Sequence, residues 1–166
     1  SARSMSRPGR EPEDPCDVDA CRESALRLLD AADRPSGALR DRLIDKGYDD
    51  ETVAAVVDRL IEVGLVDDES YAQSAVRYCV GRLMGYRGAV MELARKGVDR
   101  PLAERVCDEA RMSGVFEDAA WELGRRSAAK TQGMDPKVRK RRFWSSGGRK
   151  GHDAETLRAV AHELFD

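Results

Sequence analysis

One short pattern recurs three times along the chain and limits the folds that the chain can adopt. Lysine, glycine, one variable residue and aspartate stand together at 46–49, 96–99 and 150–153, and a run of helical periodicity follows each time. Glycine directly after the last periodic residue ends a helix, and aspartate is a favourable N-cap for the next one. A period of about fifty residues is typical of tandem helical repeats.

Apolar residues fall at matching positions when the three copies are superposed on their glycines. Each copy places two adjacent apolar residues at the same distance from its glycine: Val56 and Val57, then Val106 and Cys107, then Val160 and Ala161. Helix stop, helix cap and apolar face therefore coincide in all three copies. We predict an all-α fold of three tandem three-helix repeats that form an elongated, curved array.

The same pattern sets the predicted domain limits. Residues 1–18 are rich in Ser, Arg, Pro, Glu and Asp without apolar periodicity, so we expect a disordered tail there. The three repeats are predicted at 19–66, 67–113 and 114–166. Asp67, Asp68 and Glu69 stand at a helix start, where capping explains acidic residues better than metal chelation does.

The third repeat departs from the first two in its middle helix. Gly147 and Gly148 occupy the positions that Leu43 and Ile44 hold in the first repeat. Glycine in a helix interior costs roughly 0.5–1 kcal/mol relative to alanine. We therefore expect this helix to end early, near Trp144 or Ser145.

Composition excludes several classes of protein. No apolar run approaches the ~20 residues that a membrane-spanning helix needs, and the N-terminal residues carry no hydrophobic signal region, so we expect a cytoplasmic protein without a membrane partner. The four cysteines form no CxxC pair and only two histidines exist, so neither a disulfide framework nor a metal site is expected. No phosphate-binding glycine motif and no nucleophile–base pair is present, so we expect neither a cofactor nor an enzyme.

A basic stretch indicates a polyanionic partner. From Arg125 to Lys150 the chain has ten basic residues and one acid, Asp135, and the run KVRKRRFW at 137–144 is the densest part. Lys and Arg neutralise phosphates without reading base sequence, and Phe143 and Trp144 could stack on the bases of a single strand. Alternatively, Phe143 and Trp144 belong to the core and the basic residues form a solvated face.

A second basic group lies in the second repeat, around the sequence GRLMGYRG at 81–88 and the residues before Gly97. These side chains bind phosphates or an acidic protein surface, or they only offset a helix dipole. The candidates for contact with DNA or with an acidic partner protein are therefore Arg82, Arg87, Arg95, Lys96, Lys137, Arg139, Lys140, Arg141, Arg142, Trp144, Arg149 and Lys150.

From about Cys21 to Phe165 the chain resembles the RecX family of regulatory proteins, most specifically at 25–72, which ends in GLVDDESYA, and in the repeated glycine stop. The resemblance implies a non-enzymatic protein that binds RecA and the RecA–DNA filament. Such proteins dampen strand exchange, ATP hydrolysis and co-protease activity in homologous recombination, DNA repair and the SOS response. Some bind DNA themselves. We expect a monomer. The alternative hypothesis is a helical module that binds single- or double-stranded DNA without RecA specificity.

Overall fold

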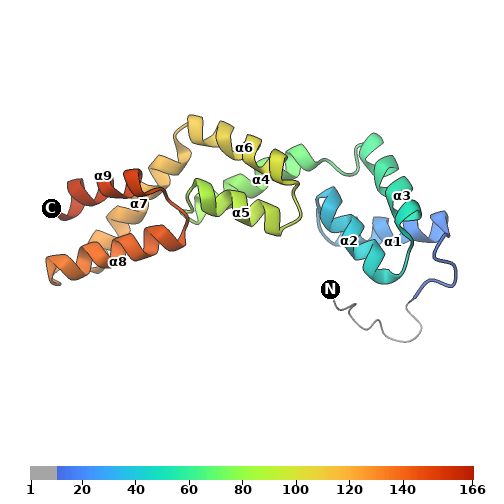
Figure 1. Ribbon diagram of the computed structural model, residues 1–166, viewed down its shortest axis with the longest axis horizontal. Helices are drawn as coiled ribbons and strands as arrows, with labels where there is room; N and C mark the ends of the chain where they lie inside the picture. Colours follow the sequence, from blue (N-terminus) through green and yellow to red (C-terminus); the bar gives the residue numbers. More distant parts are fainter. Residues whose placement is uncertain (1–10) are drawn as a thin grey trace. The chain divides into compact units, whose positions relative to one another are not determined.

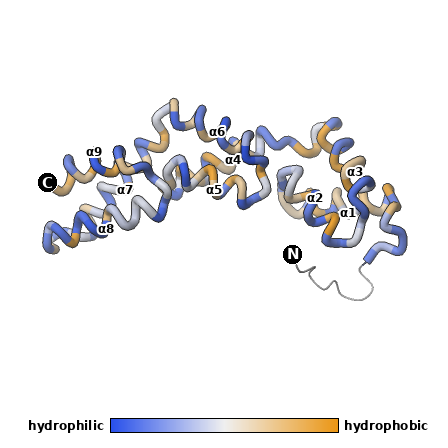
Figure 2. The backbone as a smooth tube through the Cα atoms, viewed as in Figure 1, coloured by the Kyte–Doolittle hydropathy of each residue, from blue (hydrophilic) through white to orange (hydrophobic). Residues whose placement is uncertain are grey.

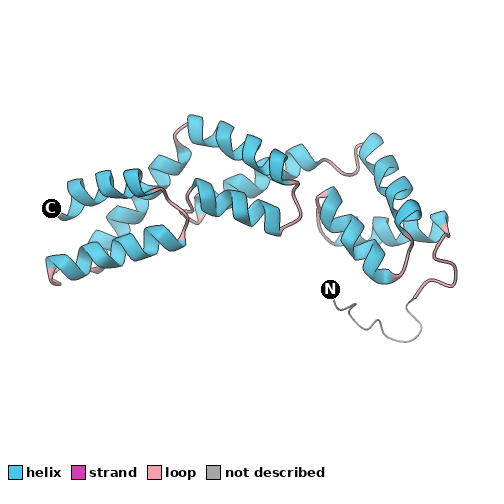
Figure 3. Ribbon diagram, viewed as in Figure 1, coloured by secondary structure: helices cyan, strands magenta, loops and turns pink. Residues whose placement is uncertain are grey.

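The computed structural model describes residues 11–166, and every regular element in that part of the chain is a helix (Figures 1 and 3). This confirms the predicted all-α class. None of these helices is long and apolar enough to cross a membrane. In chain order they are α1 Val18–Ala31, α2 Ser36–Lys46, α3 Asp50–Glu62, α4 Asp68–Gly81, α5 Tyr86–Arg95, α6 Arg100–Met112, α7 Val115–Lys130, α8 Pro136–Arg149 and α9 Ala154–Phe165.

The helices belong to two compact units. The first unit contains the described residues up to Tyr71 together with Lys96–Asp99, and the second contains Ala72–Arg95 and Arg100–Asp166. The predicted repeat limits, after residues 66 and 113, fall in the connections before α4 and before α7, and they stay a prediction. Along most of the helices, hydrophobic and hydrophilic residues follow one another every few positions, as amphipathic packing requires, whereas α8 is mostly hydrophilic (Figure 2).

The segment before α1 contacts the turn between α2 and α3 through Pro12 and Pro15. Asp17 caps α1 by accepting a hydrogen bond from the backbone N–H of Ala20 at 3.0 Å. The carbonyl of Pro15 accepts a hydrogen bond from the N–H of Asp49 at 3.0 Å. Most of the predicted tail, residues 1–10, lies outside the described residues.

The bundle of α1, α2 and α3 forms one apolar core, in which Leu39, Leu43 and Val57 are fully buried. Asp49 caps α3 through the N–H of Thr52 at 2.9 Å, as the sequence predicts. Gly47 ends α2 in the left-handed region at φ 112°. Local signals therefore place this turn correctly.

Asp68 has a role that its position at the start of α4 does not reveal. Its carboxylate accepts hydrogen bonds from both the backbone N–H of Ser36, at 2.7 Å, and the Ser36 hydroxyl. The first residue of α2 thus receives its cap from a residue 32 positions further along the chain. Asp67 caps α4 itself by accepting from the N–H of Ser70 at 3.0 Å. The acidic cluster therefore serves two helix starts.

The bundle of α7, α8 and α9 corrects one prediction. Helix α8 continues through both glycines to Arg149, so the expected end near Trp144 or Ser145 is wrong. Gly147 is buried, and a Cβ atom there would lie within 2.9 Å of both methyl carbons of Leu157 in α9. The glycine is therefore the residue that lets α8 and α9 approach, and tertiary packing overrides its poor helix propensity.

The two aromatic residues of α8 differ in burial, and only Phe143 fully follows the core alternative. Phe143 is fully buried and stacks on Phe165 of α9, with ring centroids 5.5 Å apart. Trp144 is only partly buried. Phe143 therefore belongs to the core, and its ring is not accessible to a ligand.

The turn between α8 and α9 packs on the loop between α4 and α5, all within the second unit. The N–H of Gly85 donates to the carbonyl of Lys150 at 2.8 Å, and His152 Nε2 contacts the carbonyl of Leu83 at 2.8 Å. His152 is buried, as are Tyr48 and Val98 at the same position of the other two turns. Burial lowers the pKa of His152, although the bond to Leu83 opposes the shift.

The recurring glycine turn therefore does more than end a helix. A Cβ atom on Gly88, in the first turn of α5, would lie 3.0 Å from the carbonyl carbon of Lys150, next to Gly151. In the first unit a Cβ atom on Gly37, in the first turn of α2, would lie 2.6 Å from the carbonyl oxygen of Gly97. In both places a turn glycine packs against a glycine of an earlier helix, and only glycine permits so close a backbone approach.

Candidate nucleic-acid interface

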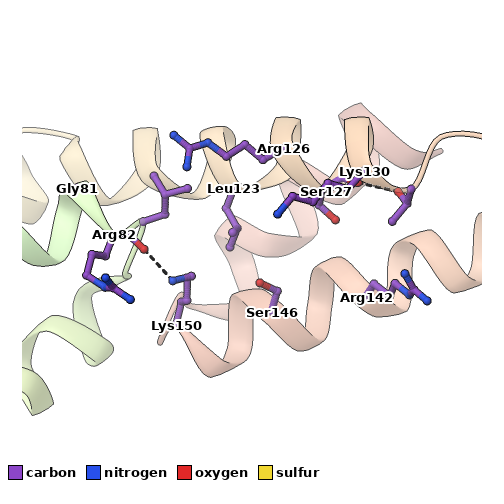
Figure 4. A pocket seen from close by; sticks show the side chains of 11 residues that line it. Gly81, Arg82, Leu123, Arg126, Ser127, Lys130, Arg142, Ser146 and Lys150 are labelled. Carbon is purple, nitrogen blue, oxygen red and sulfur yellow. Dashed lines mark hydrogen bonds between the residues drawn. The ribbon is translucent and has the colours of Figure 1, made fainter.

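A basic cleft of about 530 Å³ lies between α7, α8 and the loop that follows α4, within the second unit (Figure 4). No aspartate, glutamate or aromatic residue is among the residues that line it. We call this site the basic cleft. Five cationic side chains line it: Arg82, Arg126, Lys130, Arg142 and Lys150.

Helical periodicity brings these cations together. Arg126 and Lys130 lie four residues apart on α7, and Arg142, Ser146 and Lys150 are spaced by four along α8 and its C-cap. Residues at i and i+4 share one helix face, so each helix presents a basic row to the cleft. Leu83 and Leu123 supply the apolar part of the lining.

The loop side of the cleft is fixed by a hydrogen bond. Lys150 Nζ donates to the carbonyl of Arg82 at 2.8 Å, drawn as a dashed line in Figure 4. The bond holds the Arg82 backbone beside the end of α8 without neutralising either charge. Both cations therefore remain available to an anion.

The cations on α7 and α8 differ in how far they are already neutralised. Arg126 Nε donates to Glu122 at 3.0 Å, and Arg125 pairs with the same carboxylate at 3.2 Å. These two hydrogen-bonded arginines, Arg126 first, lower the pKa of Glu122 and keep it ionised. The side chains of Lys130 and Arg142 make no hydrogen bond or ion pair with any described residue. Together with Arg82 and Lys150, they carry the uncompensated charge of the basic cleft.

Arg139 is used inside the protein. Its Nη2 donates to the carbonyl of Ala128 at 3.0 Å, and its Nε donates to Thr131 Oγ1 at 3.1 Å. The guanidinium also lies over the Phe165 ring, 5.3 Å from the centroid. It thus satisfies a carbonyl near the end of α7, where intrahelical partners run out, and joins all three helices of the bundle.

Lys140 and Trp144 lie on a different face of α8, in a second cleft between α8 and α9 that also includes Arg158 and His162. Lys140 forms an ion pair with Asp166, which also accepts a hydrogen bond from His162. These contacts, that of Lys140 first, lower the pKa of Asp166. Cations and carboxylates alternate here, so this second cleft lacks the single-sign field of the basic cleft.

The remaining predicted residues are spread over several surfaces. Of the twelve candidates, the structure brings Arg82, Arg142 and Lys150 into the basic cleft. Sequence reasoning missed Arg126 and Lys130, although both lie in the basic stretch that it singled out. Arg139 lies outside both clefts. The other candidates outside them are Arg87 on α5, Arg95 paired with Glu92, Lys96 in the first unit, and Lys137, Arg141 and Arg149 on exposed parts of α8.

Comparison with known proteins assigns the chain to a family. The family described as RecX, first three-helix domain, matches residues 21–60. A Regulatory protein RecX from Thermobifida fusca is 37% identical over 147 residues, which are 86% of this chain and 78% of the relative. The chain belongs to the RecX family.

Further RecX proteins extend the similarity. A relative from Streptomyces lividans is 31% identical over 166 residues, covering 99% of this chain and 87% of its own. One from Mycobacterium sp. (strain JLS) is 43% identical over 100 residues, which span 54% of that protein. The crystal structure of RecX from Lactobacillus salivarius has the same fold, with a TM-score of 0.79 at 20% identity over 89% of this chain and 96% of that one.

Proposed function

We propose that this RecX-family protein binds RecA and the RecA–DNA filament and restrains the recombinase, ATPase and co-protease activities of RecA. The observation that carries the proposal is the family membership, because the relatives are named regulatory proteins and RecX resemblance implies RecA as the target. We further propose that the protein is cytoplasmic, acts as a monomer and has no enzymatic activity of its own.

The basic cleft supports the part of the proposal that concerns DNA. A filament carries a phosphate backbone, and an acid-free cleft with five cations attracts phosphates at any sequence. Restraint then follows from differential binding. A regulator shifts a filament toward an inactive state only if it binds that state more tightly, and each tenfold preference contributes about 1.4 kcal/mol.

A second candidate function is a DNA-binding module for which RecA is incidental, and the basic cleft favours it, since the cleft alone could supply DNA affinity. The two are separated by a double variant, Lys130→Ala with Arg142→Ala, compared with the unmodified protein on RecA filaments and on bare strands. If RecA is the main partner, the variant loses its affinity for the bare strand and keeps most of its affinity for the filament. An equal loss of affinity for the filament and for the bare strand would refute RecA specificity and favour the DNA-binding module.

A further inference from the structure

We infer that the basic cleft holds the phosphate backbone of one single strand of nucleic acid, and that a duplex does not enter it. This deepens the proposed function by naming the form of nucleic acid and the groups that hold it. The inference concerns this chain and a strand alone, so it is tested without RecA.

The chemistry of the lining selects the backbone rather than the bases. The lining offers guanidinium and ammonium donors together with hydroxyls, and no aromatic ring on which a base could stack. The hydroxyls of Ser127 and Ser146 have no hydrogen-bond partner among the described residues and can donate to phosphate oxygens. Bases would therefore point outward, and binding would be independent of sequence.

The dimensions of the cleft select a single strand. Its volume of about 530 Å³ is that of a small-ligand site, enough for a short length of backbone. A duplex presents its phosphates on a wide convex surface that could touch only the rim. Lys130 of α7 and Arg142 of α8 lie in the lining contributed by opposing helices, so a strand between the helices can meet cations on both sides.

The cleft is also preorganised for an anion. The bond from Lys150 Nζ to the Arg82 carbonyl fixes one end of the basic row before any ligand arrives. Groups held in place beforehand lose little entropy when a phosphate binds, which raises affinity.

The first test uses neighbouring residues that differ only in where they point. Arg142 and Arg141 are both exposed on α8, but only Arg142 lines the cleft. Binding of fluorescently labelled single strands, of oligothymidylate and of mixed sequence, is followed by anisotropy over a range of salt. We expect Arg142→Ala to weaken binding about 5- to 10-fold and to lower the salt slope by about 0.7, as loss of one phosphate contact requires. Arg141→Ala should change the affinity less than about 2-fold.

The second test changes the space of the cleft and leaves its charge unaltered. Ser146→Phe fills the cleft, whereas Ser145→Phe adds the same ring on an exposed position outside it. We expect the first variant to weaken single-strand binding at least 10-fold, the second to leave it unchanged, and neither to alter binding of the matching duplex. Thermal unfolding of each variant checks that the bundle is intact.

Several results would overturn the inference. Equal weakening by Arg141→Ala and Arg142→Ala would place binding on the whole surface of α8. Retention of single-strand affinity by an intact Ser146→Phe, or equal loss of duplex binding, would show that no strand enters the cleft. A protein that passes both tests and leaves RecA unaffected would support this inference while refuting the proposed function.

Discussion

Adjacent glycines in α8 should respond in opposite directions to the same substitution. Gly148 is exposed, and a Cβ atom there would meet nothing within 4 Å. Gly147→Ala, one residue earlier, would place its methyl group within 2.9 Å of both methyl carbons of the buried Leu157. The pair therefore separates the helix propensity of alanine from the packing between α8 and α9.

The magnitudes follow from these two environments. Alanine in a helix interior is about 1 kcal/mol more favourable than glycine, so Gly148→Ala should raise the free energy of unfolding by about 0.5–1 kcal/mol. Gly147→Ala gains the same propensity but overpacks the core, at a cost of about 1–3 kcal/mol. The variants should differ by about 1–3 kcal/mol, with Gly147→Ala the less stable.

Urea unfolding followed by tryptophan fluorescence measures this difference. Both tryptophans, Trp121 and Trp144, lie in α7 and α8, so their emission reports the bundle in question. A difference of 1 kcal/mol corresponds to roughly 4–8 °C in Tm for a unit of this size. Equal stability of the two variants, or greater stability of Gly147→Ala, would refute the close packing of α8 on Leu157.

Three further predictions concern single side chains. Arg139→Ala should lower the free energy of unfolding by about 1–3 kcal/mol in urea titrations, because two charge-assisted hydrogen bonds are lost, whereas Arg141→Ala should change it by less than about 0.5 kcal/mol. Asp68→Ala should cost about 1 kcal/mol by uncapping α2, and an unchanged Tm would contradict that role. Folding lowers the pKa of His152, so the unfolded chain binds the proton more readily than the folded chain. The contribution of His152 to the free energy of unfolding should be complete above about pH 6.5 and should fall below that pH. His152→Val should remove this component of the pH profile.

Local signals made most of the helix boundaries predictable. The caps at Asp49 and Asp153 bond to N–H groups three residues away, and Gly47 and Gly151 turn the chain at positive φ. Such interactions depend on neighbours in sequence, so the sequence alone reveals them. The superposed apolar positions were equally informative, because Val56, Val106 and Val160 are all buried.

Contacts between distant residues were not predictable in the same way. Gly147 looked like a helix breaker because Leu157, which needs the space, lies in another helix. Arg139 looked like a ligand-binding residue because its acceptors, the Ala128 carbonyl and Thr131, lie on α7 and in the turn after it. Basic charge in α8 was visible in the sequence, but which side of the helix faces a cleft depends on how α7 packs beside it.

The central claim, restraint of RecA, is tested most directly by the DNA-dependent ATP hydrolysis of RecA on single-stranded DNA, titrated with this protein far below the amount that would coat the DNA. The account predicts inhibition at these low ratios, because the protein acts on the filament. Inhibition only when the DNA is saturated would indicate competition for the strand. No effect at any ratio would contradict the proposed regulation of RecA.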